Sequence, residues 1–189
     1  MVLLGGGGMA NDRESLLRLV LFMLAGFISI LVHELGHALT GRAFGARSAI
    51  TLQAFGGYAE FSGAFFTRPR HFLVTAAGPA VQVVLGLLII LLIPDAFNLA
   101  SRAGYFWGKL AFISLFWAAL NLLPVLPLDG GQMLNALLGP ARIRLTLWIS
   151  ILTAVGGAWL GFKYLDAFLF PAFMGLFAFR SWQALRVLP

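Results

Sequence analysis

The residues best suited to chemistry lie in the segment His33-Glu34-Leu35-Gly36-His37. On a helix, residues four positions apart lie on the same face, so both imidazoles can reach a single cation. Glu34 lies beside that cation and can take a proton from a water molecule that the metal activates, as in metalloproteases with this five-residue pattern. Because the chain has only 3 His among 189 residues, chance assembly of the pattern is rare. We therefore expect a catalytic metal site here.

A third ligand has to come from elsewhere, because a catalytic zinc site normally has three protein ligands and a water. Asp129 is the strongest candidate, since it follows an apolar segment that contains Pro124 and Pro127 and it precedes two glycines. Prolines end a helix and glycines permit tight turns, so we expect an unwound segment that holds a carboxylate inside the membrane boundary. An ordinary solvated turn explains Asp129 equally well on these grounds, and Glu60 is a second candidate ligand.

The composition predicts an integral membrane protein. Of the 189 residues, 60% are hydrophobic and 11% are charged, whereas an average soluble domain has about 25% charged residues. A chain of this length cannot hide so much apolar surface from water, and such hydrophobicity also excludes disorder. The absence of Cys excludes disulfide scaffolds and thiol catalysis. The net charge of +6 comes from scattered basic residues, which favours anchoring at a membrane surface over binding of nucleic acid.

We expect an all-α polytopic membrane protein with about five transmembrane helices and a short β-hairpin. A helix needs roughly 17–25 apolar residues to cross a bilayer. The segments that come close are 16–44, 72–93, 105–123, 143–163 and 165–185. Residues 48–61 alternate instead between polar and apolar side chains, with a break at Phe55-Gly56-Gly57. This pattern predicts a hairpin that dips into the cytosolic edge of the helix bundle.

The expected organisation has three parts. Residues 1–15 form a flexible tail, residues 16–140 form a catalytic membrane core, and residues 141–189 add two spans. Cytoplasmic loops carry an excess of basic residues, so the Arg and Lys positions predict the orientation. One face receives Arg42, Arg47, Arg68, Arg70, Arg142, Arg144, Arg180 and Arg186, and the other receives Arg13, Arg18, Arg102, Lys109 and Lys163. The N-terminus should therefore lie outside and the C-terminus in the cytoplasm, in the cell membrane of a prokaryote.

The motifs together resemble the site-2 protease family of intramembrane zinc metalloproteases. The resemblance rests on the motif at 33–37, on Asn121 to Gly131 with its Leu128-Asp129-Gly130 triplet, and on Ala76-Ala77-Gly78-Pro79. It covers the chain from about Leu16 to Leu138. It implies an endopeptidase that hydrolyses peptide bonds of transmembrane protein substrates near the cytosolic membrane face.

The resemblance also implies roles for individual residues. One zinc ion per chain would be bound by His33, His37 and Asp129. Glu34 would act as general base, and Asn121 would position the substrate or stabilise the developing oxyanion. In the family, a membrane-dipping β segment pairs with the substrate. The matching candidates for substrate binding are Ile50, Leu52, Phe55, Gly56 and Gly57.

Two departures from the family pattern are visible. Gln82 stands where many relatives carry Asn three residues after the Pro, and this change can alter a local hydrogen bond. The link at 94–104 is too short for a periplasmic peptide-binding domain, and no nucleotide-binding domain is expected after the last span, which suggests a nearly bare catalytic core. The alternative function is a non-hydrolytic metal-binding membrane protein, either a transporter or a pseudo-protease that chaperones helices. The intact Glu34 argues against it, because binding alone needs no general base.

Overall fold

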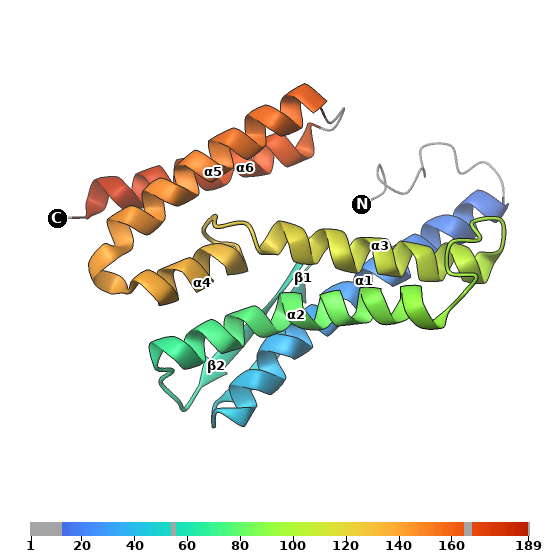
Figure 1. Cartoon of the computed structure of the whole chain (residues 1–189), viewed down its shortest axis with the longest axis horizontal. Helices are drawn as coiled ribbons and strands as arrows, with labels where there is room; N and C mark the ends of the chain where they lie inside the picture. The colour runs from blue at the N-terminus through green and yellow to red at the C-terminus, as the bar shows by residue number, and fades with distance from the viewer. Residues whose placement is uncertain (1–12, 54–55, 165–167, 189) are drawn as a thin grey trace. The chain divides into compact units, whose positions relative to one another are not determined.

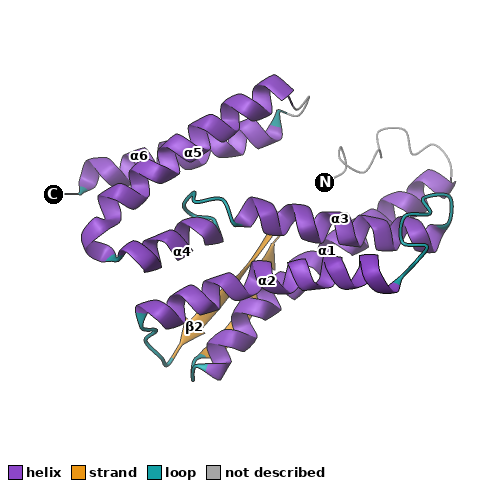
Figure 2. Cartoon of the chain, in the orientation of Figure 1, coloured by secondary structure: helices purple, strands orange, loops and turns teal. Residues whose placement is uncertain are grey.

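The computed structural model describes residues 13–53, 56–164 and 168–188. Helices dominate this part of the chain, and its two strands form a hairpin (Figure 2). The elements are α1 (Arg13–Ala43), β1 (Arg47–Gln53), β2 (Gly56–Ser62), α2 (Arg68–Leu92), α3 (Arg102–Asn121), α4 (Asp129–Leu138), the 3₁₀ turn η3 (Pro140–Arg142), α5 (Ile143–Tyr164) and α6 (Leu169–Val187). They form two compact units. Unit 1 comprises Met1–Ala64 and Ala77–Ala119, and unit 2 comprises Phe65–Ala76 and Leu120–Pro189.

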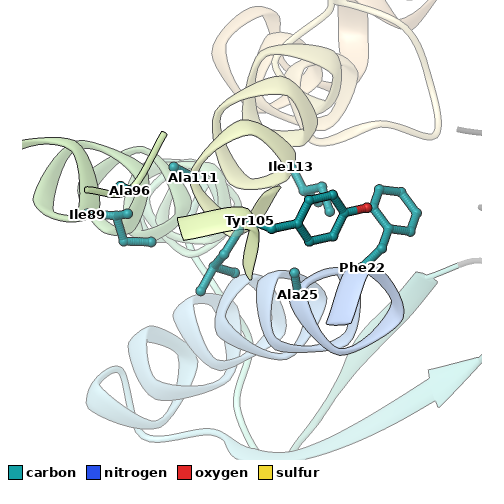
Figure 3. Packing of buried hydrophobic residues seen from close by; sticks show 8 residues of the cluster. Phe22, Ala25, Ile89, Ala96, Tyr105, Ala111 and Ile113 are labelled. Carbon is teal, nitrogen blue, oxygen red and sulfur yellow. The ribbon is translucent and has the colours of Figure 1, made fainter. Parts of the chain in front are cut away.

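The core of unit 1 lies where α1, α2 and α3 meet. Phe22 of α1, Ile89 of α2 and Tyr105 of α3 are buried in one cluster, together with Ala25 and Ile113 (Figure 3). Ala25 is completely buried, so two helices can approach closely at its position. Small residues at helix contacts are typical of membrane proteins, where association depends on close packing rather than on exclusion of water.

Large apolar side chains of the same helices point outward. On α1 the exposed ones include Leu16, Val20, Met23, Leu24 and Phe27. A helix that is apolar all round is typical of a buried or membrane-spanning segment. The outward side chains of unit 1 therefore suit a lipid environment.

The expected hairpin is confirmed. Strands β1 and β2 pair antiparallel, from Arg47 opposite Ser62 to Gln53 opposite Gly56, and both strands pack against α1 within unit 1 (Figure 1). The Ser48 hydroxyl donates a hydrogen bond to the Ala38 carbonyl of α1, at 3.2 Å. Gly41 makes room for the ring of Phe61, because a Cβ atom there would lie 2.2 Å from the ring.

The position of the turn differs from the prediction. Gly56 and Gly57 were expected to interrupt the hairpin, but they belong to β2, where they pair with Gln53 and Leu52. The strands are joined by residues 54 and 55, so Phe55 lies outside the described residues. Glycine next to a turn can remain in the strand ladder, because its backbone groups still pair with the partner strand.

Unit 2 is built around α5 and α6, which pack side by side (Figure 1). Its buried core contains Val125, Ala154, Met174 and Ala178. Helix α4 packs on α5, and the Ser150 hydroxyl of α5 accepts a hydrogen bond from the Leu126 amide at 3.1 Å. This bond ties the segment before α4 to the helix pair.

Four helical segments in the described part of the chain are long and apolar enough to cross a membrane: Arg13–Ala43, Arg68–Leu92, Arg102–Asn121 and Pro140–Tyr164. They match the first four expected spans to within a few residues. Helix α6 occupies most of the fifth expected span but is not one of these four. Helix α1 begins at Arg13, and the first twelve residues of the expected tail lie outside the described residues.

Helix α4 is a correction to the sequence prediction. The segment from Asn121 to Gly131 was expected to be unwound throughout, but a helix begins at Asp129 and contains both glycines. The irregular backbone is limited to residues 122–128, which include the two prolines. Asp129 therefore occupies the first turn of a helix, where the peptide dipoles favour a negative charge.

Candidate metal centre

His33 and His37 lie on one face of α1, as their spacing predicts. Their Nε2 atoms are 3.0 Å apart, and their rings meet edge to face with centroids 4.6 Å apart. Both side chains are buried, with exposed fractions of 6% and 8%. The two imidazoles thus point their Nε2 atoms toward one position inside unit 1.

This geometry fits two ligands of one metal ion. Two nitrogen lone pairs facing each other at this distance would repel, so a proton or a cation has to lie between them. Two nitrogen ligands of a tetrahedral zinc ion, each at 2.0–2.1 Å from the metal, are about 3.3 Å apart. The separation of 3.0 Å between the histidine Nε2 atoms is close to that value.

Two glycines give this pair its room. A Cβ atom on Gly78 of α2 would lie 2.3 Å from Nε2 of His37, so any larger residue would displace the ring. A Cβ atom on Gly36 of α1 would lie 2.7 Å from the carbonyl oxygen of Ala77. The backbones of α1 and α2 therefore lie close together beside the histidines, and this close approach requires glycine at both positions.

Glu34 is also buried in unit 1, with an exposed fraction of 5%. It precedes the Gly36 contact on α1 and follows His33 directly, so it projects about 100° around the helix from that histidine. A carboxylate in a candidate membrane helix is rare and is by default a sign of function. Its position agrees with a group that transfers protons next to a metal ion rather than one that coordinates the ion.

Gln82 is a partner of this site that the sequence analysis did not assign. Its side-chain oxygen lies 2.8 Å from Nδ1 of His33, and the residue is completely buried. A sequence signal existed, since residues 76–92 of α2 contain no other polar side chain. Isolated polar residues in apolar helices deserve the same scrutiny as charged ones.

Asn121 and Asp129 belong to unit 2, where they flank the irregular segment 122–128. Asn121 is the last residue of α3 and is half-buried, and Asp129 is the first residue of α4 and is 8% exposed. A Cβ atom on Gly130 would lie 2.1 Å from the Leu122 carbonyl oxygen, and one on Gly131 would lie 2.5 Å from the Leu126 amide nitrogen. The glycines allow the irregular segment to fold against the first turn of α4, which carries Asp129.

The candidate substrate-binding residues lie on both strands of the hairpin. Ile50 and Leu52 are in β1, and Gly56 and Gly57 are in β2. Ile50 is half-buried, whereas Glu60, the second candidate ligand, is exposed on β2 opposite Ala49.

Comparison with known proteins places these features in context. Residues 90–160, which include Asn121 and Asp129, match the model of peptidase family M50. The chain is 39% identical over 112 residues to "Putative zinc metalloprotease sll0528" of Synechocystis sp., a match that covers 59% of this chain and 29% of that protein. It is 29% identical over 132 residues to a zinc metalloprotease of Methanocaldococcus jannaschii, with 69% of this chain and 38% of that protein covered.

The fold has a close counterpart among solved structures. The site-2 protease from Methanocaldococcus jannaschii matches with a TM-score of 0.65 and 24% identity, over 100% of this chain and 86% of that one. The expected resemblance to site-2 proteases is confirmed. The names of the two curated relatives agree with the expectation of a zinc metalloprotease. The chain spans less than half the length of each of these relatives.

Proposed function

We propose that this chain is an intramembrane zinc metalloendopeptidase that cleaves transmembrane protein substrates near the cytosolic membrane face. The observation that carries the proposal is the pair of buried histidines on an apolar helix, with Nε2 atoms 3.0 Å apart and a buried glutamate beside them. The match to peptidase family M50 and the zinc metalloproteases among its relatives support the reaction and the metal.

The proposed zinc ligands are His33, His37 and Asp129. Each can offer one ligand atom, and all three residues are buried. Two imidazoles and one carboxylate form a donor set that zinc prefers, and it leaves a fourth position open. When bound, zinc activates a water molecule and polarises the carbonyl of the scissile peptide bond.

The remaining chemistry belongs to Glu34 and Asn121. The Glu34 carboxylate accepts the proton of the attacking water and later transfers it to the leaving amine. The Asn121 amide, at the end of α3, donates a hydrogen bond that positions the substrate or stabilises the developing oxyanion. Both roles need a site that lets water in but excludes bulk lipid.

The length of α1 supports a site below the membrane surface. Its 31 residues correspond to about 46 Å, more than the roughly 30 Å hydrocarbon core of a bilayer. His33 and His37 precede the end of the helix at Ala43 by about 15 Å and 9 Å. If this end lies at the cytosolic surface, the histidines lie inside the membrane on the cytosolic side.

The hairpin is the proposed substrate-binding element. A transmembrane helix is a poor protease substrate, because its carbonyls are already bonded within the helix. An extended peptide could add to a strand of the β1–β2 sheet, and the main-chain bonds formed there would offset the unwinding. The proposed contacts are with Ile50, Leu52, Phe55, Gly56 and Gly57.

The proposed orientation follows from the basic residues. Arg42 and Arg47 flank the end of α1, and Arg142 and Arg144 flank the start of α5. An excess of Arg on these loops places them in the cytoplasm, with the N-terminus outside and the C-terminus inside. Reporter fusions at the two termini would test this, and an exported C-terminal reporter would contradict it.

The decisive experiment on the reaction is Glu34→Gln in reconstituted vesicles with a transmembrane substrate. Loss of the general base should reduce cleavage at least about 100-fold while zinc stays bound. Glu14→Gln, the same substitution at the other end of α1, serves as the matched control and should cleave at the wild-type rate. Cleavage by Glu34→Gln at the wild-type rate would refute the proposed mechanism.

A further inference from the structure

Gln82 holds a fully buried hydrogen-bond network that ends on His33. Its Nε2 lies 3.1 Å from the carbonyl oxygen of Ser29 and 2.9 Å from the Ser29 hydroxyl oxygen, and its Oε1 lies 2.8 Å from Nδ1 of His33. The hydroxyl of Ser114 in turn donates to the Ser29 hydroxyl at 3.0 Å. Gln82, Ser29 and Ser114 are each 0% exposed. The network thus links α2, α1 and α3 within unit 1.

The orientation of the Gln82 amide follows from the Ser29 carbonyl. A backbone carbonyl oxygen can only accept hydrogen bonds, so the amide group that faces it has to be the NH₂. The opposite orientation would place two acceptor oxygens 3.1 Å apart in a buried site. Such a repulsion is strongly unfavourable, because a buried site has no water to satisfy either oxygen.

The amide orientation determines the tautomer of His33. Because Oε1 of Gln82 can only accept, Nδ1 of His33 has to carry the hydrogen of the bond at 2.8 Å. A neutral imidazole has one protonated nitrogen, so Nε2 keeps its lone pair. That Nε2 is the atom that faces His37 and is available to a metal ion.

We propose that Gln82 is a positioning residue for the metal site. It holds His33 in the tautomer and ring orientation that bind zinc through Nε2, and it thereby sets the affinity of the site for zinc. The backbone carbonyl of Ser29 fixes the orientation of the Gln82 amide. The Ser29 and Ser114 hydroxyls contribute further hydrogen bonds to the network but do not determine that orientation. This inference rests on the proposed function, since it requires a metal at His33.

The first test measures zinc affinity by chelator competition in detergent-solubilised protein. Gln82→Met keeps the approximate size of the side chain but removes the oxygen that accepts the hydrogen bond from His33. Zinc affinity should therefore fall about 10-fold to 100-fold, the range typical of groups that orient a metal ligand. Ser29→Ala keeps the carbonyl, so affinity should change less than about threefold by the same comparison. Thr75→Val, a buried substitution on α2, is the matched control and should bind zinc like the wild type.

The second test measures the tautomer of His33 directly. It uses protein in which Gln82, Ser29 and Ser114 are unchanged. Nitrogen-15 NMR of histidine-labelled, metal-free wild-type protein has only 3 His to assign, and a His71→Asn variant identifies one of them. His33 should show a protonated Nδ1 and an unprotonated Nε2. The opposite tautomer in the wild-type protein would overturn the proposal even if Gln82→Met did not fold.

The outcomes separate this inference from the proposed function. If wild-type protein binds zinc and cleaves substrate but Gln82→Met binds zinc equally well, the role of Gln82 is refuted and the protease assignment stands. If wild-type protein binds no zinc while the NMR spectrum shows the expected tautomer, the metalloprotease assignment fails and the hydrogen-bond argument survives. Equal zinc affinity of wild-type and Thr75→Val protein shows that any loss in Gln82→Met is specific.

Discussion

At the scale of single residues, the candidate metal site depends on two glycines as much as on its proposed ligands. His37 can point its Nε2 toward His33 only because Gly78 has no side chain, and α1 can lie close to α2 only because Gly36 has none. A glycine inside a helix normally lowers stability by about 1 kcal/mol relative to alanine. Here the close approach of α1 and α2 requires glycine at positions 36 and 78. The two glycines are therefore part of the site together with the histidines.

Gly78→Ala should therefore weaken metal binding. The added Cβ atom would lie 2.3 Å from Nε2 of His37, so the ring has to move, and zinc affinity should fall about tenfold or more. Chelator competition measures the effect. Gly156→Ala on α5 is the control, because a Cβ atom there meets nothing within 4 Å and should leave zinc affinity unchanged. Wild-type affinity in Gly78→Ala would show that the site tolerates the displacement.

The choice between Asp129 and Glu60 as third ligand can be made by substitution. Asp129 is buried at the start of α4, whereas Glu60 is exposed on the hairpin. Asp129→Ala should lower zinc affinity by more than the roughly 10-fold to 100-fold typical of groups that only orient a ligand. Glu60→Ala should retain stoichiometric zinc, as measured by metal analysis of purified protein. The reverse pattern would assign the third ligand to Glu60.

At the scale of elements, α4 is held at both ends. At its start, the irregular segment 122–128 folds against Gly130 and Gly131. At its end, the Arg68 guanidinium donates hydrogen bonds to the carbonyls of Ala136, at 2.9 Å, and of Leu137. A cation suits the negative end of the helix dipole. The helix that carries Asp129 thus has a defined position within unit 2.

Arg68→Met should loosen this helix. The substitution keeps most of the apolar stem but removes the charge and both hydrogen bonds, so the free energy of unfolding should fall by about 1 kcal/mol. Denaturation by SDS in mixed micelles measures the change. Arg180→Met, an exposed position on α6, is the matched control and should have little effect. An unchanged unfolding curve for Arg68→Met would mean that α4 is held by its other contacts.

At the scale of the whole molecule, the sequence predicted the helices better than the details of the site. Long apolar segments located four spans to within a few residues, because a membrane requires that length whatever the helices pack against. Alternation located the hairpin, but not its turn. Helix α4 was missed because Gly130 and Gly131 were interpreted as residues of a tight turn, whereas they lie inside the helix and allow a close backbone contact.

The candidate site was also only partly predictable. The motif from His33 to His37 is local, and the helix repeat alone places the two rings together. The role of Gln82 is not local, since it depends on how α2 packs on α1 and on which atom of Ser29 faces the amide. Sequence reasoning noticed the residue as a departure from the family but had no means to find its partners.

Removal of the metal should affect stability as well as catalysis. A ligand that binds only the folded protein stabilises it by about 2.7 kcal/mol at 100 times its dissociation constant. The melting temperature of the zinc-loaded protein in detergent, followed by the fluorescence of its 5 Trp, should therefore exceed that of the chelator-treated protein. Readdition of zinc should restore both stability and cleavage. Identical melting with and without zinc would argue against a metal that is bound only in the folded state.

The small and hydroxylated residues at the centre of unit 1 have a consequence for temperature. Ala25, Ser29, Ala111, Ser114 and Ala118 are all completely buried, so small side chains make part of the contact between the helices. The heat-capacity change of unfolding scales with the apolar surface that becomes hydrated, and helices that separate within lipid hydrate almost none. The free energy of unfolding of this helix cluster should consequently vary only gently with temperature. Cooling should not destabilise it in the way that cooling weakens the hydrophobic core of a water-soluble protein.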